Sequence, residues 1–171
     1  MRRICVIALV AAAALATVAI ASGASGSRNV QVLDACDAAS FNAVIGPGTC
    51  VKQGGVTFSQ FIEQLETQGR APAWRFAPGG LKLSTGGTLT ATNRGGEFHT
   101  FTEVAAFGGG CVDELNAILG LTPVPECAIP GIFGSTGIEP RGELETGALA
   151  AGTHRFICLI HPWMKTTVAV G

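Results

Sequence analysis

Short segments in which apolar and polar residues alternate run through the second half of the chain. They occupy residues 81–84, 88–93, 143–147, 153–158 and 165–170. Alternation with period two is the pattern of a strand that buries one face, and glycine-rich turns separate the segments. Ala151-Gly152 is predicted to turn a hairpin between 143–147 and 153–158, and 165–170 is predicted to be the closing strand. The pattern therefore predicts an all-β sandwich.

One segment has a helical pattern instead. Apolar residues recur at positions i, i+3, i+4 and i+7 in the segment 58–68, namely Phe58, Phe61, Ile62 and Leu65. Thr57 and Gln60 have the spacing of a capping box, which predicts that the helix begins at Phe58. We interpret this amphipathic helix as one that packs on the sheet. Trp74 and Phe76, two positions apart, are expected to share an inward face.

A region rich in glycine and proline lies between the strand patterns. Residues 112–119 predict one or two helical turns, and Pro123 and Pro125 follow them. Residues 129–140 are predicted to be a loop. Because Cys111 and Cys127 bracket the helical part, we interpret residues 107–127 as an insertion that a disulfide could staple.

The N-terminus has the pattern of an export signal. Two arginines follow Met1, residues 4–20 are apolar and rich in alanine, and Ala19-Ile20-Ala21 matches the small-x-small pattern of a cleavage site. We predict a signal peptide over residues 1–24, an N-terminal extension with a disulfide and a helix over 25–70, and the main domain over 71–171. A retained membrane anchor is the alternative, since the apolar run approaches the length of a bilayer span. The expected location is the periplasm or the cell exterior.

The cysteine count agrees with export. Five cysteines remain once Cys5 is removed with the signal, and an odd number in an oxidising compartment leaves one thiol without a partner. The simplest pairing is local, Cys36 with Cys50 and Cys111 with Cys127, although the other pairings of these four remain open. Cys158 is then the free thiol. It risks disulfide exchange unless something masks it.

Charge and motifs exclude several classes of function. Without Arg2 and Arg3 the chain has nine basic and twelve acidic residues, a net charge of −3, and no basic run. Nucleic acid is therefore not expected as a partner. The glycine-rich motifs of nucleotide-binding loops and of serine hydrolases are absent from the sequence. We expect a protein that is not an enzyme.

Four residues have the chemistry of soft-metal ligands. The segment Cys158-Leu-Ile-His161-Pro-Trp-Met164 places a thiolate, an imidazole and a thioether in one loop, and His99 lies upstream at the start of a predicted strand. Thiolate and thioether sulfur suit Cu(I), imidazole nitrogen suits Cu(II), and the set is that of a mononuclear electron-transfer copper site. A zinc site would need a second close Cys or His pair, which the sequence lacks. The alternative is a buried Cys158 with His161 capping a turn. We interpret His154 as structural.

These residues resemble the copper ligands of the cupredoxins, and the C-x2-H-x2-M loop is most similar to that of amicyanin and plastocyanin. The resemblance covers residues 81–104 and 143–171. It implies a Greek-key sandwich that holds one copper ion, with His99, Cys158 and His161 in a plane and Met164 as a weak axial ligand. Cupredoxins commonly have Asn after the first histidine, where it ties the two copper loops together. This chain has Thr100, whose hydroxyl can bridge with shorter reach.

The resemblance implies a carrier of single electrons between redox proteins. If the edge of His161 reaches solvent, Ile160, Pro162 and Trp163 would form an apolar rim where a partner docks. The alternative is that Trp163 turns inward. Other functions stay open, namely copper storage or delivery, a copper-free interaction module and, more remotely, a thiol enzyme. A membrane is a partner only if the N-terminal segment is retained.

Overall fold

The computed structural model describes residues 26–171 of the 171-residue chain. The predicted signal peptide, residues 1–24, lies outside the described residues. Within residues 26–171, no helix has both the length and the hydrophobicity needed to cross a bilayer.

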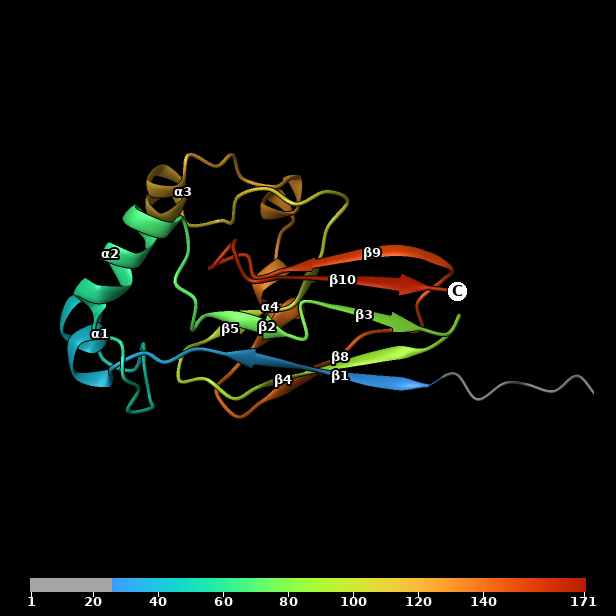
Figure 1. Ribbon diagram of the computed structural model, residues 1–171, viewed down its shortest axis with the longest axis horizontal. Helices are drawn as coiled ribbons and strands as arrows, with labels where there is room; N and C mark the ends of the chain where they lie inside the picture. Colours follow the sequence, from blue (N-terminus) through green and yellow to red (C-terminus); the bar gives the residue numbers. More distant parts are fainter. Residues whose placement is uncertain (1–25) are drawn as a thin grey trace, which may run out of the picture.

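Most strands belong to two four-stranded sheets that face each other (Figure 1). The first sheet has the order β2 (Arg75–Ala77), β1 (Ser27–Leu33), β4 (Thr88–Asn93) and β8 (Glu143–Glu145). The second has the order β3 (Gly80–Leu83), β10 (Lys165–Val170), β9 (Gly152–Ile157) and β6 (Thr102–Glu103). The predicted all-β sandwich is confirmed. Residues 27–33, which the sequence analysis placed in the extension before the main domain, form a strand inside the sandwich.

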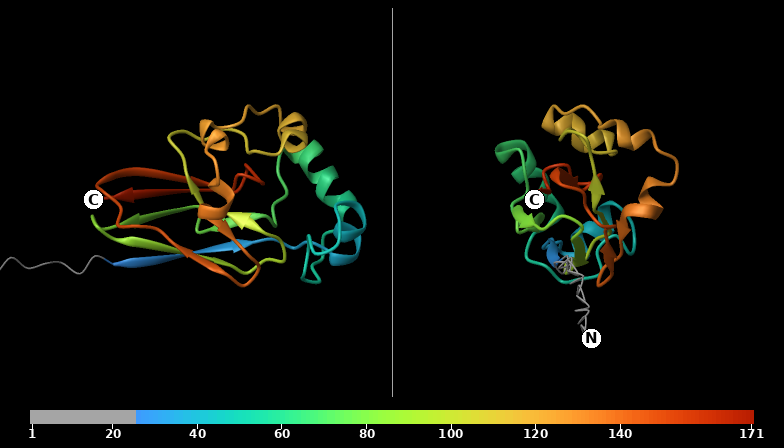
Figure 2. Two further views of the ribbon diagram at one scale, coloured as in Figure 1. Left: turned by 180° about the vertical axis from the view of Figure 1, so that it is seen from behind. Right: turned by 90° about the vertical axis from the view of Figure 1, so that its right-hand side faces the viewer.

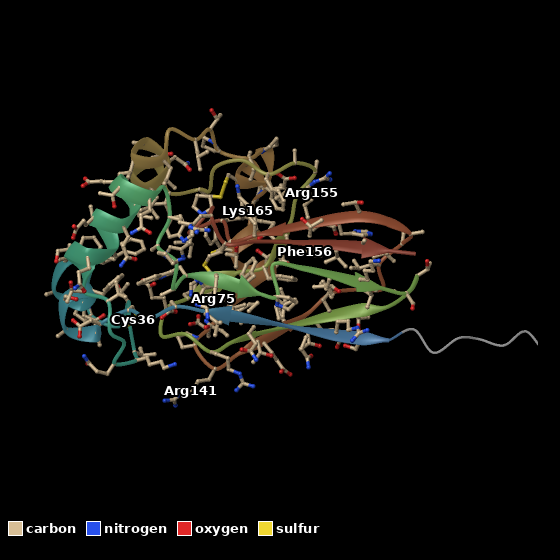
Figure 3. All side chains as sticks on the ribbon, viewed as in Figure 1. Cys36, Arg75, Arg141, Arg155, Phe156 and Lys165 are labelled. Carbon is tan, nitrogen blue, oxygen red and sulfur yellow. A yellow bond between two sulfur atoms is a disulfide. The ribbon has the colours of Figure 1, made fainter. Side chains whose placement is uncertain are left out.

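The core between the sheets is built by the inward-facing residues of the alternating segments. In β4, Leu89 and Ala91 are fully buried while the threonines between them are partly exposed. Phe156 of β9, labelled in Figure 3, stacks on Phe101 with the ring centroids 4.4 Å apart. Each strand therefore contributes its apolar face to one continuous core.

The predicted hairpin between residues 143–147 and 153–158 is wrong. β8 pairs with β4 in the first sheet, whereas β9 pairs with β10 and β6 in the second. The connection crosses from one sheet to the other: the N–H of Leu149 donates to the carbonyl of Gly87, and the Leu149 side chain is buried. The alternation specified two strands, but not which partner each strand pairs with.

Two helices cover the end of the sandwich that lies away from the C-terminus (Figures 1 and 2). α2 (Phe58–Gln68) has the predicted bounds, with the capping box between Thr57 and Gln60 and a left-handed Gly69 at its end. α1 (Ala38–Val44) was not predicted, because only Phe41 of its seven residues is buried and no apolar stripe marks it. Its N-cap is Asp37, whose carboxylate accepts the N–H of Ser40.

Aromatic rings join these helices to the sandwich. Phe41 of α1 and Phe61 of α2 both pack on Trp74, with ring centroids 5.7 Å and 4.7 Å from it. Trp74 and Phe76 are both buried, as predicted. The cluster fixes the position of α1 and α2 relative to the first sheet.

The insertion contains α3 (Asp113–Leu119) and ends in a 3-10 turn at Pro125–Ala128, and α4 (Ile132–Thr136) follows it. The predicted helix is thus confirmed, but the prediction of a loop over residues 129–140 is wrong. α4 leads into β7 (Gly137–Ile138), which pairs with β5 (His99–Thr100). This strand is two residues long and depends on a distant partner, so local composition did not reveal it.

The disulfides follow the local pairing. Cys36 is bonded to Cys50 and Cys111 to Cys127, and among the described residues Cys158 is the one free cysteine, fully buried. The first bridge joins the segment just before α1 to the loop after it, and the second closes the insertion.

The reactivity of the cysteines toward a thiol reagent tests the assignment of two disulfides and one free thiol. Unreduced, metal-free protein lacking residues 1–25 is expected to react with one equivalent of a thiol reagent after unfolding, at Cys158, and with almost none before, because burial blocks access. Peptide mapping of the alkylated protein measures both outcomes. A native disulfide that includes Cys158 would contradict the proposed metal ligation.

Candidate metal centre

Three of the four predicted ligands converge at one end of the sandwich. His99 is the first residue of β5, Cys158 directly follows β9, and His161 lies in the loop between β9 and β10. The Cys158 Sγ is 3.8 Å from the Nδ1 of His99 and 3.8 Å from the Nδ1 of His161, and the two Nδ1 atoms are 3.2 Å apart. All three side chains are buried. The structure therefore assembles a compact set of two nitrogens and one sulfur.

The donor set fits a single metal ion. With these separations, the point equidistant from the three donor atoms lies about 2 Å from each of them, which is the usual length of a bond from a transition metal to nitrogen or sulfur. Two imidazoles and one thiolate in a plane are the donors of a type 1 copper site. No side chain has to move to create this site.

The two loops that supply the ligands are tied to each other. The N–H of Leu159 donates to the Thr100 hydroxyl over 2.8 Å, and the N–H of Thr100 points at the Cys158 sulfur over 3.5 Å. Within the second loop, the N–H of Cys158 donates to the carbonyl of Met164, and the N–H of Met164 donates to the carbonyl of His161. Thr100 thus makes the predicted bridge between the loops.

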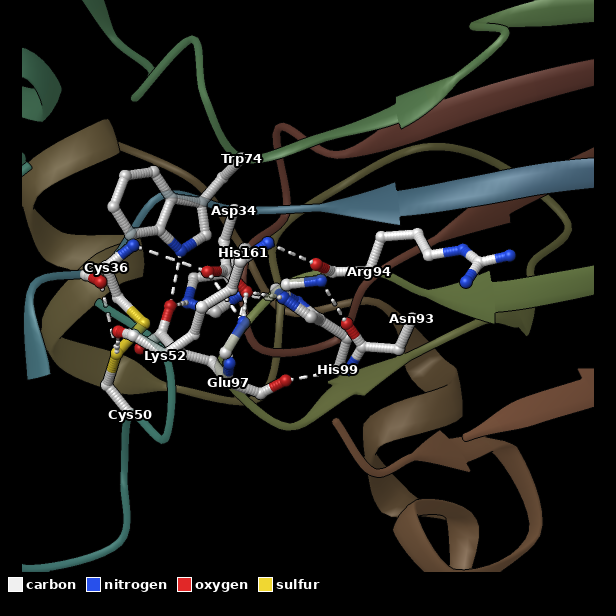
Figure 4. Close-up of polar contacts among 12 residues, drawn as sticks. Asp34, Cys36, Cys50, Lys52, Trp74, Asn93, Arg94, Glu97, His99 and His161 are labelled. Carbon is white, nitrogen blue, oxygen red and sulfur yellow. Dashed lines mark hydrogen bonds and ion pairs between the residues drawn. A yellow bond between two sulfur atoms is a disulfide. The ribbon is translucent and has the colours of Figure 1, made fainter. Parts of the chain in front are cut away.

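Asp34 is a functional residue that the sequence analysis missed. Its Oδ2 lies 2.9 Å from the Nε2 of His99, and both side chains are inaccessible to solvent (Figure 4). The N–H groups of Gly96 and Glu97 donate to the same carboxylate over 2.9 Å and 3.1 Å. A carboxylate that accepts the Nε2 proton leaves Nδ1 of His99 free for a metal and fixes the orientation of the ring.

The glycines before His99 make this contact possible. A Cβ on Gly95 would overlap the Asp34 Oδ2 atom, and a Cβ on Gly96 would lie 2.6 Å from the side chain of Lys52. Only residues without a side chain let the loop close over the carboxylate. The pair Gly95-Gly96 directly before Glu97-Phe98-His99 is the local signal that could have pointed to a buried partner.

A second buried carboxylate lies beside His161. The indole N–H of Trp74 donates to Glu97 Oε2, and the same oxygen is 3.8 Å from the Nε2 of His161 (Figure 4). Burial raises the pKa of Glu97 above its ordinary value, against the opposing charges of His161 and His99. Each candidate histidine ligand therefore has its own acidic neighbour on the side away from Cys158.

The electrostatics of the metal-free site favour a thiolate. Burial alone would raise the pKa of Cys158, but hydrogen bonds and charge from His161 and His99 lower it well below the usual value of a thiol. Burial alone would lower the pKa of His99, but the hydrogen bonds with Asp34 and Cys158 raise it to about 9. These contacts favour the thiolate form of Cys158, which suits a soft cation, and metal binding at His99 would displace the proton that its raised pKa retains.

Met164, the predicted axial ligand, lies in the same loop as His161 and is fully buried. Met164→Leu is expected to keep the visible colour of the copper-loaded protein and to raise its reduction potential, because the weak donor that favours Cu(II) is lost while the plane of three ligands stays intact. Voltammetry measures the potential, and the retained absorption band serves as the internal control. An unchanged potential would mean that Met164 does not contact the metal.

The condition for the apolar docking rim, that the edge of His161 reaches solvent, is not met. The His161 side chain is only 5% exposed, and the rings of Phe61 and Trp163 pack on it with centroids 6.1 Å and 5.4 Å away. Trp163 turns inward and donates its indole N–H to the carbonyl of Ala71. α2 therefore covers the face that the sequence analysis assigned to docking.

His154 is not part of this group. Its Nδ1 lies 2.6 Å from Glu103 and its Nε2 lies 2.9 Å from the carbonyl of Ala150. The structural interpretation of His154 agrees with these contacts.

Comparisons with known proteins give matches at the level of structure. No protein-family model matches the sequence, and no curated protein matches it. A purple cupredoxin from Nitrosopumilus maritimus is similar over 84% of this chain and 99% of its own, with 15% identity and a TM-score of 0.46. Plastocyanin from Dryopteris crassirhizoma is similar over the same shares, with 14% identity and a TM-score of 0.40. The reduced Cu(I) form of a mutant amicyanin is similar over 60% of this chain and 77% of its own, with 21% identity and a TM-score of 0.38. This chain is a β-sandwich with its candidate ligands at one end, which is the architecture that the resemblance to cupredoxins implied.

Proposed function

We propose that this protein binds one copper ion in a type 1 site and carries single electrons outside the cytoplasm. The observation that carries the proposal is the buried convergence of His99 Nδ1, Cys158 Sγ and His161 Nδ1, at distances that suit one ion. Met164 is the proposed axial ligand. Bound copper would supply the one-electron change between Cu(I) and Cu(II).

The chain's own residues contribute rigidity and a dry environment. Asp34 and the backbone of residues 96 and 97 hold His99, and Thr100 holds the loop of Cys158. Ligands that are fixed in one arrangement rearrange little when the charge on a metal changes, so electron exchange has a low barrier. The thiolate favoured by the histidines is the proposed covalent path for the electron.

The partner and the location are part of the proposal. Two disulfides fit an oxidising compartment such as the periplasm or the cell exterior. A redox protein remains the proposed partner. Of the segment 160–163, Ile160 and Trp163 keep some exposure, while His161 and Pro162 are buried. Docking there would therefore use the edge of the loop and the adjacent surface of α2.

Copper storage or delivery is a second candidate, and the burial of His161 favours storage. A metal without a solvent-facing ligand exchanges slowly, which suits retention. A carrier exchanges electrons rapidly with a small inorganic oxidant and keeps its copper, a storage protein keeps its copper but exchanges electrons slowly, and a delivery protein releases Cu(I) to a chelator. Stopped-flow absorption measures both rates on the same sample.

Copper loading tests the proposal directly. Protein lacking residues 1–25 and titrated with Cu(II) is expected to show an intense thiolate-to-copper band in the visible at one equivalent, with a narrow hyperfine splitting in the EPR spectrum. Both signals arise because the thiolate delocalises the unpaired spin. A protein that binds copper without colour would exclude the type 1 site. A protein that binds no copper would exclude it as well and favour a copper-free interaction module.

A further inference from the structure

A cavity of about 720 Å³ lies beside the candidate metal centre. Three helices and three loops form its walls: α1, α2, α3, the loop after α1, the loop before His99 and the loop that holds His161. These are the helices at the end of the sandwich in Figures 1 and 2. The volume falls within the range of pockets that hold small organic molecules.

The walls are apolar and partly aromatic. The apolar lining includes Phe41, Phe58, Phe61, Ile62, Leu115 and Ile160. Three further lining residues, Val44, Ile45 and Ile118, are exposed by 63%, 56% and 36%. Exposed apolar side chains gathered at the edge of a cavity lose contact with water when a ligand enters. The cavity therefore favours a molecule with an apolar body.

One polar group of the lining lacks a full set of partners. Glu97 is only 5% exposed and lines the cavity together with His161. Its Oε2 accepts the indole N–H of Trp74, whereas Oε1 makes no hydrogen bond within residues 26–171. Oε1 does not belong to the fully enclosed side-chain atoms without a partner, so a ligand in the cavity can reach it and replace water as its hydrogen-bond donor.

We propose that this cavity binds a small aromatic molecule with a hydroxyl group, such as a phenol, with the ring among the aromatic and aliphatic walls and the hydroxyl on Glu97 Oε1. A hydroxyl suits this position better than an amine or a carbonyl, because it donates to a carboxylate and also accepts from a carboxylic acid. The ligand would lie against His161. Binding there does not require copper, so it can be measured whether or not the centre is loaded.

Two molecules of almost the same shape test the proposal. p-Cresol and toluene differ by one hydroxyl, and calorimetry on the metal-free protein is expected to show saturable binding of p-cresol at least tenfold tighter than that of toluene. Amide resonances of Phe58, Ile62 and Leu115 are expected to shift during an NMR titration with p-cresol, which locates the site without any substitution. Repeating the titration on copper-loaded protein should also shift the visible band, since the ligand contacts His161.

A pair of variants provides the matched control. Ile118→Trp adds bulk at the rim of the cavity, on an exposed side of α3, and should weaken p-cresol binding at least tenfold. Ile129→Trp adds the same bulk just after the insertion, at a residue that is 50% exposed and does not line the cavity, and should leave binding unchanged.

Several outcomes would overturn the proposal. These are the absence of saturable p-cresol binding, equal affinity for toluene, resonance shifts confined to another surface, and equal effects of the two variants. Binding of p-cresol by a protein that never acquires copper would leave this proposal standing and refute the electron-transfer function. Normal copper spectra without p-cresol binding would refute the ligand site and leave the electron-transfer function standing.

Discussion

Cys158→Ser is expected to abolish the intense visible band of the copper-loaded protein completely. The band requires charge transfer from a thiolate, and a serine hydroxyl is a poor donor to Cu(I) and supplies no sulfur. The Cys158 Sγ atom also lies 3.8 Å from the Nδ1 atom of each candidate histidine ligand. Absorption and EPR spectra of wild type and variant, loaded with equal copper, measure the loss.

The double variant Cys111→Ser/Cys127→Ser is the matched control, since it also removes cysteine sulfur but from the insertion. It should cost about 3 kcal/mol of stability, as expected for a bridge that closes a loop of this length, and should keep the band. Colour that survives in Cys158→Ser would refute the assignment of Cys158 as a ligand.

Asp34→Asn is expected to lower copper affinity by about 10- to 100-fold and to destabilise the metal-free protein by about 1–3 kcal/mol. The amide has nearly the same shape as the carboxylate, but its NH2 group cannot accept the N–H groups of Gly96 and Glu97 or the proton of His99. Competition with a copper chelator measures the affinity, and urea unfolding measures the stability.

The same variant should change the response to acid. Burial alone would raise the pKa of Asp34, but hydrogen bonds with His99 and with the N–H of Gly96 lower it to about 2, from an ordinary value of 3.8. A carboxyl whose pKa is lower in the folded protein stabilises it above the ordinary pKa, and this contribution is lost as the pH falls toward 2. About 2 kcal/mol should therefore disappear between pH 4 and pH 2 in the wild type and not in Asp34→Asn.

Asp37→Asn is the control for both measurements. Asp37 is three residues away and caps α1, with no contact to the metal ligands among its hydrogen bonds. It should cost little stability, since Asn also caps helices well, and should leave copper affinity unchanged. If the two variants lowered copper affinity equally, Asp34 would have no special relation to His99.

Features that depend on local sequence were predictable. The capping box of α2, the short-range disulfides and the loop from Cys158 to Met164 each lie within about 17 residues, so spacing and residue type specify them. The position of His99 at the start of a strand could also be predicted, because a glycine turn precedes an alternating segment.

Features that depend on distant segments were not predictable. The pairing of β8 with β4 and of β7 with β5 depends on how the sheets assemble. The local sequence of residues 137–145 does not specify which strand each of them pairs with. The contact of Asp34 with His99 spans 65 residues, and the cover of α2 over His161 depends on the packing of Phe61 and Trp74. An aspartate at the end of a strand has no pattern that distinguishes a buried partner of histidine from a turn residue.

The contact between Asp34 and His99 determines when the metal centre can form during folding. Asp34 follows the first strand of the sandwich, whereas Cys158 and His161 immediately precede the last. During synthesis the ribosome must release the loop of residues 158–164 before the site can close, and closing such distant contacts is a late and slow event in folding. A chain that is truncated before this loop, or whose first strand has not paired with the sheet, lacks part of the set formed by the metal ligands and Asp34. Copper colour would then report that both ends of the protein have reached their native positions.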